Sequence, residues 1–349
     1  MNIDINTIKN WLNSLETSSG LFKISNNALH QNSIDATSLA LDLKQMLGME
    51  QATLKDSLKY FNQHQEEETG FFHEPFVDEL DFSIDRIKEM SGTYLGYQVS
   101  AILLELGVTP QSHFRFYEQF LNDRDMKEYM LNFMPWDKAP MGAGNMCDHG
   151  ITMMRMNVKM GYEEYQSIID DMYSWFEQNQ DKNTGFWGSI ALQGNNGLVQ
   201  AGYHLMRGSY FYDKKEINYI EKIIDITIKS IYECPIFKDG VGEGCHDMDH
   251  FVILERGLYL TNGYRENDIK LIAIQRLEQL EVMKKNDGGF SFEANNSITN
   301  HNRYDVTPGL NESDLVGTVF YLETILRIKK ILGEEVEWKS SATHGVSDE

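Results

Sequence analysis

Two short runs of the sequence combine cysteine, histidine and aspartate directly after glycine-rich turns. The first run extends from Gly142 to His149, and the second from Gly240 to His250. Both follow the order Gly, any residue, Gly, two further residues and then Cys, with His and Asp close behind. Side chains of these types transfer protons, act as nucleophiles or bind metals. These runs are therefore the first candidates for a reaction centre.

In the second run, helical spacing would place the reactive side chains on one face. Cys245 lies four positions before Asp249, and His246 lies four positions before His250. At about 100° per residue, these four and Arg256 fit within an arc of about 140°. A His and an Asp on one buried face can share a proton and serve as general acid and base. We therefore predict that Cys245, His246, Asp249 and His250 are catalytic.

The first run suggests a second set of catalytic groups, Asp148 and His149. A helix amino terminus lowers the pKa of a thiol, so either Cys147 or Cys245 could be a thiolate that is accessible to ligands. The alternative is structural. In that case the cysteines fill small buried spaces, and the His and Asp side chains cap the starts of helices.

The same glycine-rich turns recur along the whole chain and indicate a repeat. They begin at residues 20, 70, 142, 185, 240 and 288, and aromatic residues follow most of them. A recurring unit of this length is typical of architectures in which one unit cannot bury its apolar face alone.

The segments around the turns have two kinds of helical pattern. Those before the turns are amphipathic: 4–17, 51–65, 113–133, 163–180, 215–232 and 266–285. Those after the turns carry less charge, as buried helices do: 34–48, 91–107, 147–161, 196–212, 246–262 and 313–332. We predict an all-α fold, an (α/α)6 toroid of six helical hairpins with inner and outer rings. It would form one domain over residues 1–336, and the polar tail 337–349 would be disordered.

Several of these turns resemble a known family. The turn 288–290, a polar loop and the run 313–318 at the start of an apolar helix resemble the repeat of the terpenoid cyclase and protein prenyltransferase superfamily. The segments 92–97 and 184–188 are similar to further copies, so the resemblance covers nearly the whole chain. It implies a toroid with a central cavity, although a fold does not fix a reaction.

A toroid of this kind would start its inner helices at one rim, where turns and loops surround the cavity. Aromatic rings there could stabilise a carbocation or stack on sugars, although Gly-aromatic turns also pack repeats together. The predicted substrate-binding residues are Trp187, Phe72, Tyr94, Phe290, Arg256 and Asp314.

The resemblance also raises the question of zinc. Protein farnesyltransferases hold zinc with an Asp, a Cys two residues later and a His on the next inner helix. The run 243–245 resembles the first part, but Gly317 stands where the His is expected. Lanthipeptide cyclases, also toroids, use adjacent Cys and His with a distant Cys, which would make Cys147, Cys245 and His246 the zinc ligands. No cofactor is firmly predicted, and zinc is the alternative.

Three functions fit this sequence. The first is an enzyme similar to isoprenoid cyclases or prenyltransferases, because the run 247–250 resembles the Asp-any-Asp-Asp motif of class II terpene cyclases, with His250 in place of the final Asp. The second is a carbohydrate-active enzyme, an epimerase, glycosidase or lyase, because the polar loop 295–303 suits hydroxyl-rich ligands. The third is a non-catalytic binding protein. The central cavity would distinguish these functions. Its lining would be apolar and aromatic in an isoprenoid enzyme and polar in a carbohydrate-active enzyme, and side chains would fill the cavity in a non-catalytic scaffold.

Composition limits the partners of this 349-residue chain. Its net charge of −22 argues against nucleic acids and anionic membranes, because both require clustered Lys and Arg. No apolar run approaches the roughly 20 residues that span a bilayer. Three cysteines and an amino terminus without a signal pattern favour a cytoplasmic location. We expect a small-molecule partner, an isoprenoid or a saccharide, and the sequence does not indicate the oligomeric state.

Overall fold

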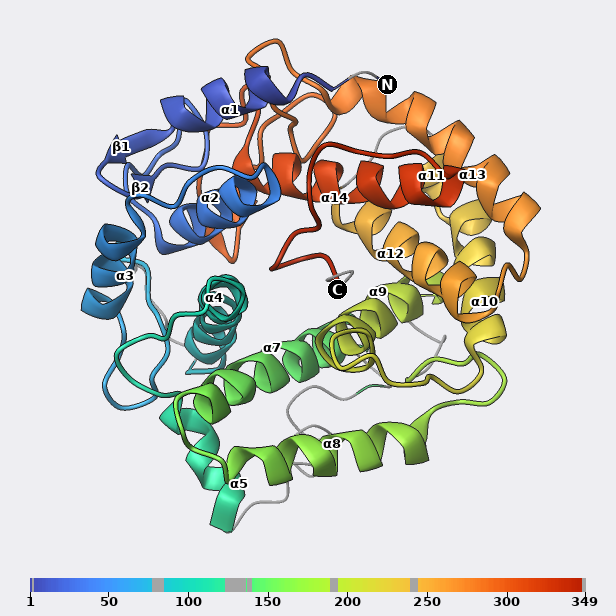
Figure 1. Cartoon of the computed structure of the whole chain (residues 1–349), viewed down its shortest axis with the longest axis horizontal. Helices are drawn as coiled ribbons and strands as arrows, with labels where there is room; N and C mark the ends of the chain where they lie inside the picture. The colour runs from blue at the N-terminus through green and yellow to red at the C-terminus, as the bar shows by residue number, and fades with distance from the viewer. Residues whose placement is uncertain are drawn as a thin grey trace.

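The computed structural model is mostly helical, as predicted (Figure 1). It describes residues 1, 3–76, 85–122, 136, 140–188, 194–238 and 244–346. The helices nearer the centre of Figure 1 are α2 (Ile34–Met46), α4 (Asp85–Glu105), α7 (Pro140–Lys159), α9 (Gly194–Met206), α12 (Gly244–Leu260) and α14 (Leu315–Leu332). The helices at the outside are α1 (Ile5–Ser14), α3 (Leu54–Gln63), α5 (Gln119–Asn122), α8 (Tyr165–Asn179), α10 (Ile220–Glu233) and α13 (Glu266–Gln279).

The six inner helices contact one another in a closed order. Helix α2 contacts α4, α4 contacts α7, and α7 contacts α9. Helix α9 then contacts α12, α12 contacts α14, and α14 returns to α2. The first and last parts of the chain are therefore packed against each other.

The predicted helix positions agree with these elements, with one correction. Helix α7 begins at Pro140, so the glycines at 142 and 144 are helical and do not form a turn. A Cβ atom on Gly144 would lie 2.2 Å from the carbonyl oxygen of Ala201. Glycine is needed there because α7 and α9 approach closely. In the sequence, glycines required by helix packing cannot be distinguished from those of a glycine-rich turn. Part of the predicted helix 113–133 and the turn at 240 lie outside the described residues.

The Gly-aromatic turns join neighbouring hairpins. Gly70 has a φ of +78°, and a Cβ there would lie 2.3 Å from the carbonyl oxygen of His113, just before the next outer elements, η2 (Arg115–Glu118) and α5. Gly288 has a φ of +119° and is packed against Thr7 of α1. Positive φ angles favour glycine. The repeat in the sequence thus marks contacts between one hairpin and the next, including the contact between the last and the first.

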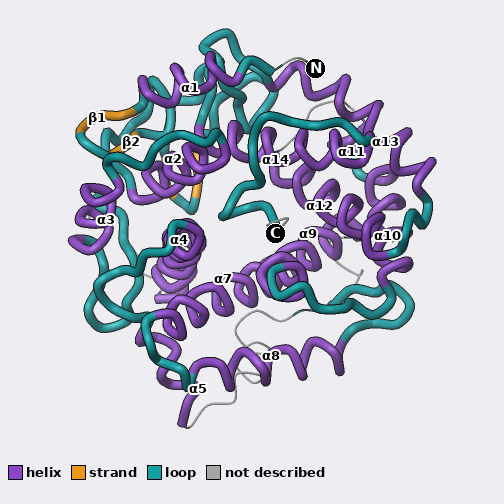
Figure 2. Tube along the Cα trace, in the orientation of Figure 1, coloured by secondary structure: helices purple, strands orange, loops and turns teal. Residues whose placement is uncertain are grey.

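Short elements complete the fold (Figure 2). Strands β1 (Glu16–Ser18) and β2 (Leu21–Phe22) pair antiparallel, as do β3 (Asn300–His301) and β4 (Tyr304–Asp305). The remaining short helices are α11 (Pro235–Lys238), η4 (Leu280–Met283) and a π-helical turn, η3 (Arg207–Phe211), which continues α9. π-Helical turns inside helices often occur at functional sites.

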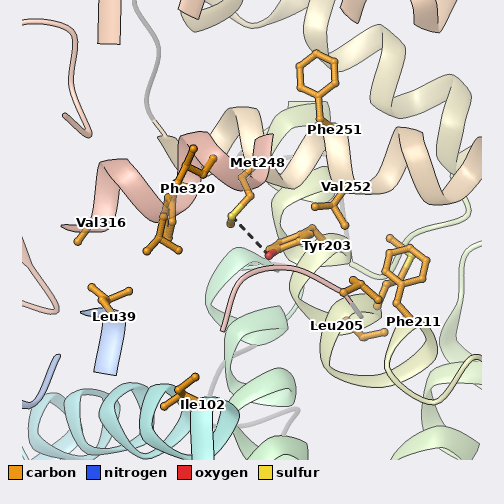
Figure 3. Close-up of a cluster of buried hydrophobic side chains, with 14 of the residues drawn as sticks. Leu39, Ile102, Tyr203, Leu205, Phe211, Met248, Phe251, Val252, Val316 and Phe320 are labelled. Carbon is orange, nitrogen blue, oxygen red and sulfur yellow. Dashed lines mark hydrogen bonds between the residues drawn. The ribbon is translucent and has the colours of Figure 1, made fainter. Parts of the chain in front are cut away.

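Apolar side chains from several inner helices meet in one core (Figure 3). Leu39 of α2, Ile102 of α4 and Phe320 of α14 converge with side chains of α9 and α12 in this view. No described helix is long and apolar enough to cross a membrane.

The predicted disorder of the tail is wrong for residues 337–346, which we call the C-terminal segment. In Figure 1 this segment runs from α14 to the centre of the molecule. The Trp338 side chain is 7% exposed and donates a hydrogen bond of 2.9 Å from Nε1 to the carbonyl oxygen of Leu322. Thr343 is fully buried. Polar composition suggested disorder because a tail sequence does not reveal the buried partners that its polar groups will meet.

Candidate functional site

The reactive residues of α12 face in two directions. His246 bonds to side chains of α9: Nδ1 lies 3.0 Å from Asn196 Nδ2, and Nε2 lies 3.5 Å from Gln200 Nε2. Cys245 is half-buried and lies close enough to Tyr94 of α4 for its charge to raise the pKa of that tyrosine. These contacts cross between inner helices: His246 and Asn196 lie in the first turns of α12 and α9, whereas Tyr94 lies near the middle of α4.

His250 does not join this group, contrary to the prediction of one reactive face. Its Nε2 lies 2.9 Å from Ser230 Oγ of α10, and its Nδ1 lies 2.7 Å from the carbonyl oxygen of His246. Burial lowers its pKa to about 3. Asp247 also points outward and forms an ion pair of 2.5 Å with Arg276 of α13. Both residues attach α12 to the outer helices.

Asp249 is fully buried, and neither carboxyl oxygen has a hydrogen-bond partner among the described residues. Burial raises its pKa well above the ordinary value, although the charge of Arg207 opposes the shift. The charge of Asp249 in turn raises the pKa of Tyr203 on α9. Burial of this kind favours the protonated form of a carboxyl group, which can donate a proton.

Asp148 and His149 of α7 have different environments. Asp148 accepts hydrogen bonds from Nε of Arg207, at 3.0 Å, and from its Nη2. Burial alone would raise the pKa of Asp148, but the ion pair with Arg207 lowers it below the ordinary value. His149 stacks on Tyr97 with ring centroids 4.7 Å apart, and burial lowers its pKa to about 3. Asp148 is therefore an anion held by Arg207, and His149 is a neutral imidazole.

A chain of polar contacts joins α2, the β3–β4 hairpin and α4. Nδ1 of His301 lies 2.5 Å from Oδ2 of Asp35, and its Nε2 lies 3.0 Å from the hydroxyl of Tyr94. Gln98 Nε2 donates to that hydroxyl at 2.7 Å. Burial would lower the pKa of His301, but the carboxylate of Asp35 raises it above its ordinary value. The arrangement can pass a proton between Tyr94 and His301, with Asp35 orienting the imidazole.

Sequence analysis predicted only Tyr94 of these four residues. Asp35 and His301 lie 266 positions apart, and no local spacing connects them. The only signal was the polar loop 295–303, which contains His301.

The N-terminal end of α2 is organised by Glu74. Its carboxylate accepts hydrogen bonds of 2.9 Å from the backbone amides of Ile34 and Asp35 and of 2.8 Å from Ser33 Oγ. Burial raises the pKa of Glu74 to about 7. This cap fixes the position of Asp35 relative to His301.

The expectation of an accessible Cys147 thiolate is corrected. Cys147 is 2% exposed, and burial raises its pKa above the ordinary value. Because α7 begins at Pro140, this thiol lies well inside the helix, where the positive helix end does not act on it. Among the described residues, no three His, Cys, Asp or Glu side chains lie close enough together to bind a metal ion. The predicted zinc ligands Cys147, Cys245 and His246 therefore do not form such a group.

Most predicted substrate-binding residues have packing roles instead. Phe72, Trp187 and Phe290 are almost fully buried and pack against other aromatic rings, Phe114, Tyr210 and Tyr321. Asp314 caps α14, accepting at 2.7 Å from the amide of Gly317 and at 2.9 Å from the amides of Phe292 and Ile298. Arg256 donates at 2.9 Å to the carbonyl oxygen of Val346 in the C-terminal segment. Tyr94 alone lies in the polar chain described above.

A cavity of about 660 Å³ lies at the opposite ends of the inner helices. Its lining includes Arg155, Arg207, Lys330 and parts of the C-terminal segment such as Ser341 and Gly345. The C-terminal segment thus lies between this cavity and the middle of the molecule.

Comparisons with known proteins identify no relative of this chain. No protein-family model matches the chain, and searches of curated proteins and of solved structures find no significant match.

Proposed function

We propose that the chain is an (α/α)6 toroid, similar in architecture to terpenoid cyclases and protein prenyltransferases, and that it is an enzyme. Its substrate would be a small molecule that binds where the inner helices begin, and its reaction would depend on proton transfer. The closed order of contacts from α2 to α14 supports the toroid. The alternation of inner and outer helices in Figure 1 supports it too.

The observation that carries the enzymatic proposal is the state of Asp249. A buried carboxyl group without hydrogen bonds costs free energy, of the order of 1–3 kcal/mol in proteins. A residue kept in this state is a candidate general acid, because burial without hydrogen-bond partners favours its protonated form. The relay of Asp35, His301 and Tyr94 would provide a second proton-transfer group.

A saccharide is the substrate class that these side chains favour. His246 with Asn196 and Gln200, and Tyr94 with Gln98, offer hydrogen-bonding groups on the inner helices α12, α9 and α4. Hydroxyl groups of a saccharide could exchange hydrogen bonds with these polar side chains, whereas a hydrocarbon chain could form none with them.

Proton-initiated isoprenoid cyclisation is the second candidate. Asp249 occupies the position of the middle Asp in the Asp-any-Asp-Asp motif, and burial raises its pKa in the direction that such an acid requires. The polar contacts around His246 and His301 favour the saccharide.

A ligand screen with matched variants tests the proposal. Purified protein would be assayed by thermal shift and for turnover with a panel of neutral monosaccharides, disaccharides and uronates, and with isoprenoid alcohols and diphosphates. We expect saccharides to raise Tm. We expect Asp249→Asn to lower kcat by about 10²-fold or more, the typical contribution of a positioned proton carrier.

Stability separates a catalytic role of Asp249 from a structural one. Because its pKa is raised on folding, its contribution to stability is lost as the pH rises. Asp249→Asn should therefore be as stable as the wild type or more stable above pH 7. Asp171→Asn, on the exposed side of α8, is the matched control and should change neither kcat nor the stability of the fold. Full turnover in Asp249→Asn would contradict the proposal.

A further inference from the structure

We propose that the C-terminal segment is a working part of the reaction centre and that His344 is its general base. This inference rests on the function proposed above and adds a residue that the sequence patterns did not single out. Contacts with inner helices hold the segment inside the molecule and support this assignment.

Asp42 of α2 binds three successive residues of the segment. Its carboxylate accepts from Ser341 Oγ at 2.6 Å, from the amide of Ala342 at 2.8 Å and from the amide of Thr343 at 3.2 Å. It also accepts from Thr343 Oγ1. Four donors from one short stretch fix the backbone of the segment and the direction of the Thr343 hydroxyl.

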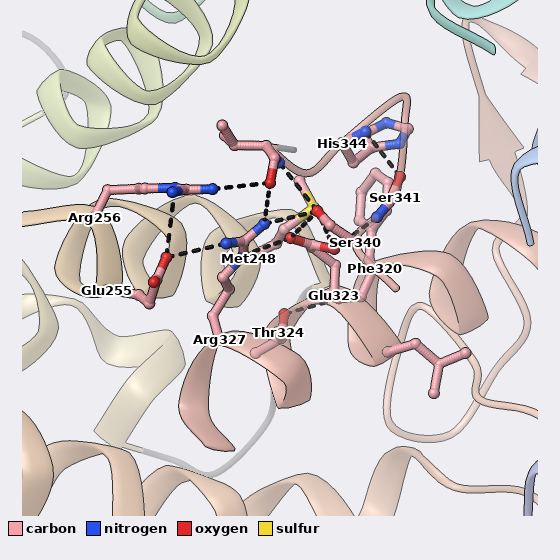
Figure 4. Close-up of polar contacts among 12 residues, drawn as sticks. Met248, Glu255, Arg256, Phe320, Glu323, Thr324, Arg327, Ser340, Ser341 and His344 are labelled. Carbon is pink, nitrogen blue, oxygen red and sulfur yellow. Dashed lines mark hydrogen bonds and ion pairs between the residues drawn. The ribbon is translucent and has the colours of Figure 1, made fainter. Parts of the chain in front are cut away.

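A buried charged network on α12 and α14 holds both sides of His344 (Figure 4). Arg327 donates from Nη2 to Ser340 Oγ at 2.7 Å and to the carbonyl oxygen of Val346 at 2.8 Å. Its Nε donates to Glu323 at 2.6 Å, and both side chains are fully buried. Buried ion pairs of this kind contribute more to a single defined position than to net stability. The segment is thus placed as specifically as an inner helix.

These contacts bring the His344 ring to the middle of the molecule. The ring centroid lies 4.3 Å from that of Phe320 on α14 and 6.4 Å from that of Tyr97 on α4. The hydroxyl of Tyr203 on α9 donates to its backbone carbonyl. The charge of Arg207 acts on the imidazole, and His204, His301 and His149 lie within electrostatic range of it. His344 therefore lies within electrostatic range of His301, and Tyr203, which binds its backbone carbonyl, interacts electrostatically with Asp249.

The hydrogen bonds determine which nitrogen carries the proton. Thr343 Oγ1 donates its proton to Asp42 and lies 2.7 Å from Nδ1 of His344. The threonine oxygen must accept from Nδ1–H, which leaves a lone pair on Nε2. Burial and then the charge of Arg207 lower the pKa of His344, so the ring is neutral at pH 7.

The proton balance of the proposed step is complete. Nε2 of His344 takes a proton from a hydroxyl or C–H group of the bound molecule, and the electron pair of that bond stays on the substrate. Nδ1–H remains bonded to Thr343, whose contact with Asp42 compensates the imidazolium charge. The protonated carboxyl of Asp249 gives a proton to another position of the substrate. Water then returns a proton to Asp249 and accepts one from His344.

Two experiments on the full-length wild-type protein require no substrate. The nitrogen shifts of ¹⁵N-labelled histidine, assigned with His344→Gln, should show His344 as neutral with Nδ1–H between pH 5 and 8, and Thr343→Val should lose this preference. Diethyl pyrocarbonate, which attacks unprotonated imidazole, should modify His344 at a rate that does not fall from pH 7 to pH 5. An Nε2–H tautomer would overturn the inference, as would His344 reacting only after denaturation.

Turnover then distinguishes this inference from the proposed function. With the best saccharide of the panel, His344→Gln should lower kcat by about 10²-fold or more. His64→Gln, at the end of the outer helix α3, is the matched control and should leave kcat unchanged. If Asp249→Asn lowers kcat and His344→Gln does not, His344 is not the general base, and the proposed function remains supported. Full turnover in both would overturn both.

Discussion

Nδ1 of His301 lies 2.5 Å from Oδ2 of Asp35, so a hairpin late in the chain is attached to the first residues of its first inner helix. Both side chains are largely buried. The two side chains also attract each other as an ion pair, because the carboxylate favours the protonated imidazole.

This pair predicts a pH dependence of stability. Burial opposes the shift, but Asp35 raises the pKa of His301 above its ordinary value of 6.5. The stabilisation is complete below about pH 6.5 and is lost as the pH rises through the folded-state pKa. We expect the unfolding free energy to fall between pH 6 and 9, and to fall less in Asp35→Asn. Equal slopes in the two proteins, measured by urea denaturation, would exclude the pair as the cause.

The buried ion pair of Asp148 and Arg207 predicts a large loss of stability on breaking it. Arg207→Met leaves a carboxylate in the interior without its partner and should cost about 3–5 kcal/mol. Urea denaturation measures this change. The exposed pair of Lys270 and Glu266 on α13 is the control, since Lys270→Met should cost at most about 0.5 kcal/mol. A small loss in Arg207→Met would mean that Asp148 can become neutral without cost.

The order of the C-terminal segment predicts that Trp338 stabilises the fold. Trp338→Ala removes a buried indole and its hydrogen bond to Leu322, and it should cost about 3–5 kcal/mol. The adjacent Glu337 is exposed, and Glu337→Ala should change stability by less than about 0.5 kcal/mol. Equal thermal unfolding of the two variants would show that the segment is not packed in solution.

The cysteines should differ in reactivity. Cys245 is half-buried, whereas Cys147 is 2% exposed with a raised pKa. We expect a maleimide to label Cys245 in the native protein and Cys147 only on unfolding. Mass spectrometry of the labelled peptides measures both rates. Faster labelling of Cys147 would restore its predicted role as an accessible thiol.

The sequence predicted the helices well and the site in part. Apolar residues at helical spacing report burial along each segment, and this placed the inner helices within a few residues, apart from the earlier start of α7. The same spacing does not reveal which buried face points to the centre. Asp249 was therefore grouped with His250, which lies against α10.

Contacts between distant segments were beyond the sequence. Asp35 with His301, and Asp42 with Thr343, are pairs that no local pattern connects. Polar residues in a tail suggest exposure unless their buried partners are known. Trp187 and Phe72 are buried in the structure, and their substrate-binding role stays a prediction, because an aromatic residue after a glycine suits packing as well as binding.

The contact between Gly288 and Thr7 has a consequence for synthesis on the ribosome. The first hairpin emerges early, but its partners α13 and α14 are among the last helices made. Until then α2 lacks one of its two neighbours, and its apolar flank stays exposed to other nascent chains. The C-terminal segment follows α14 in the chain and can reach its place in the interior only after that helix has been made. A chain that ended directly after α14 would therefore have every described helix present and would lack the buried contacts of the C-terminal segment.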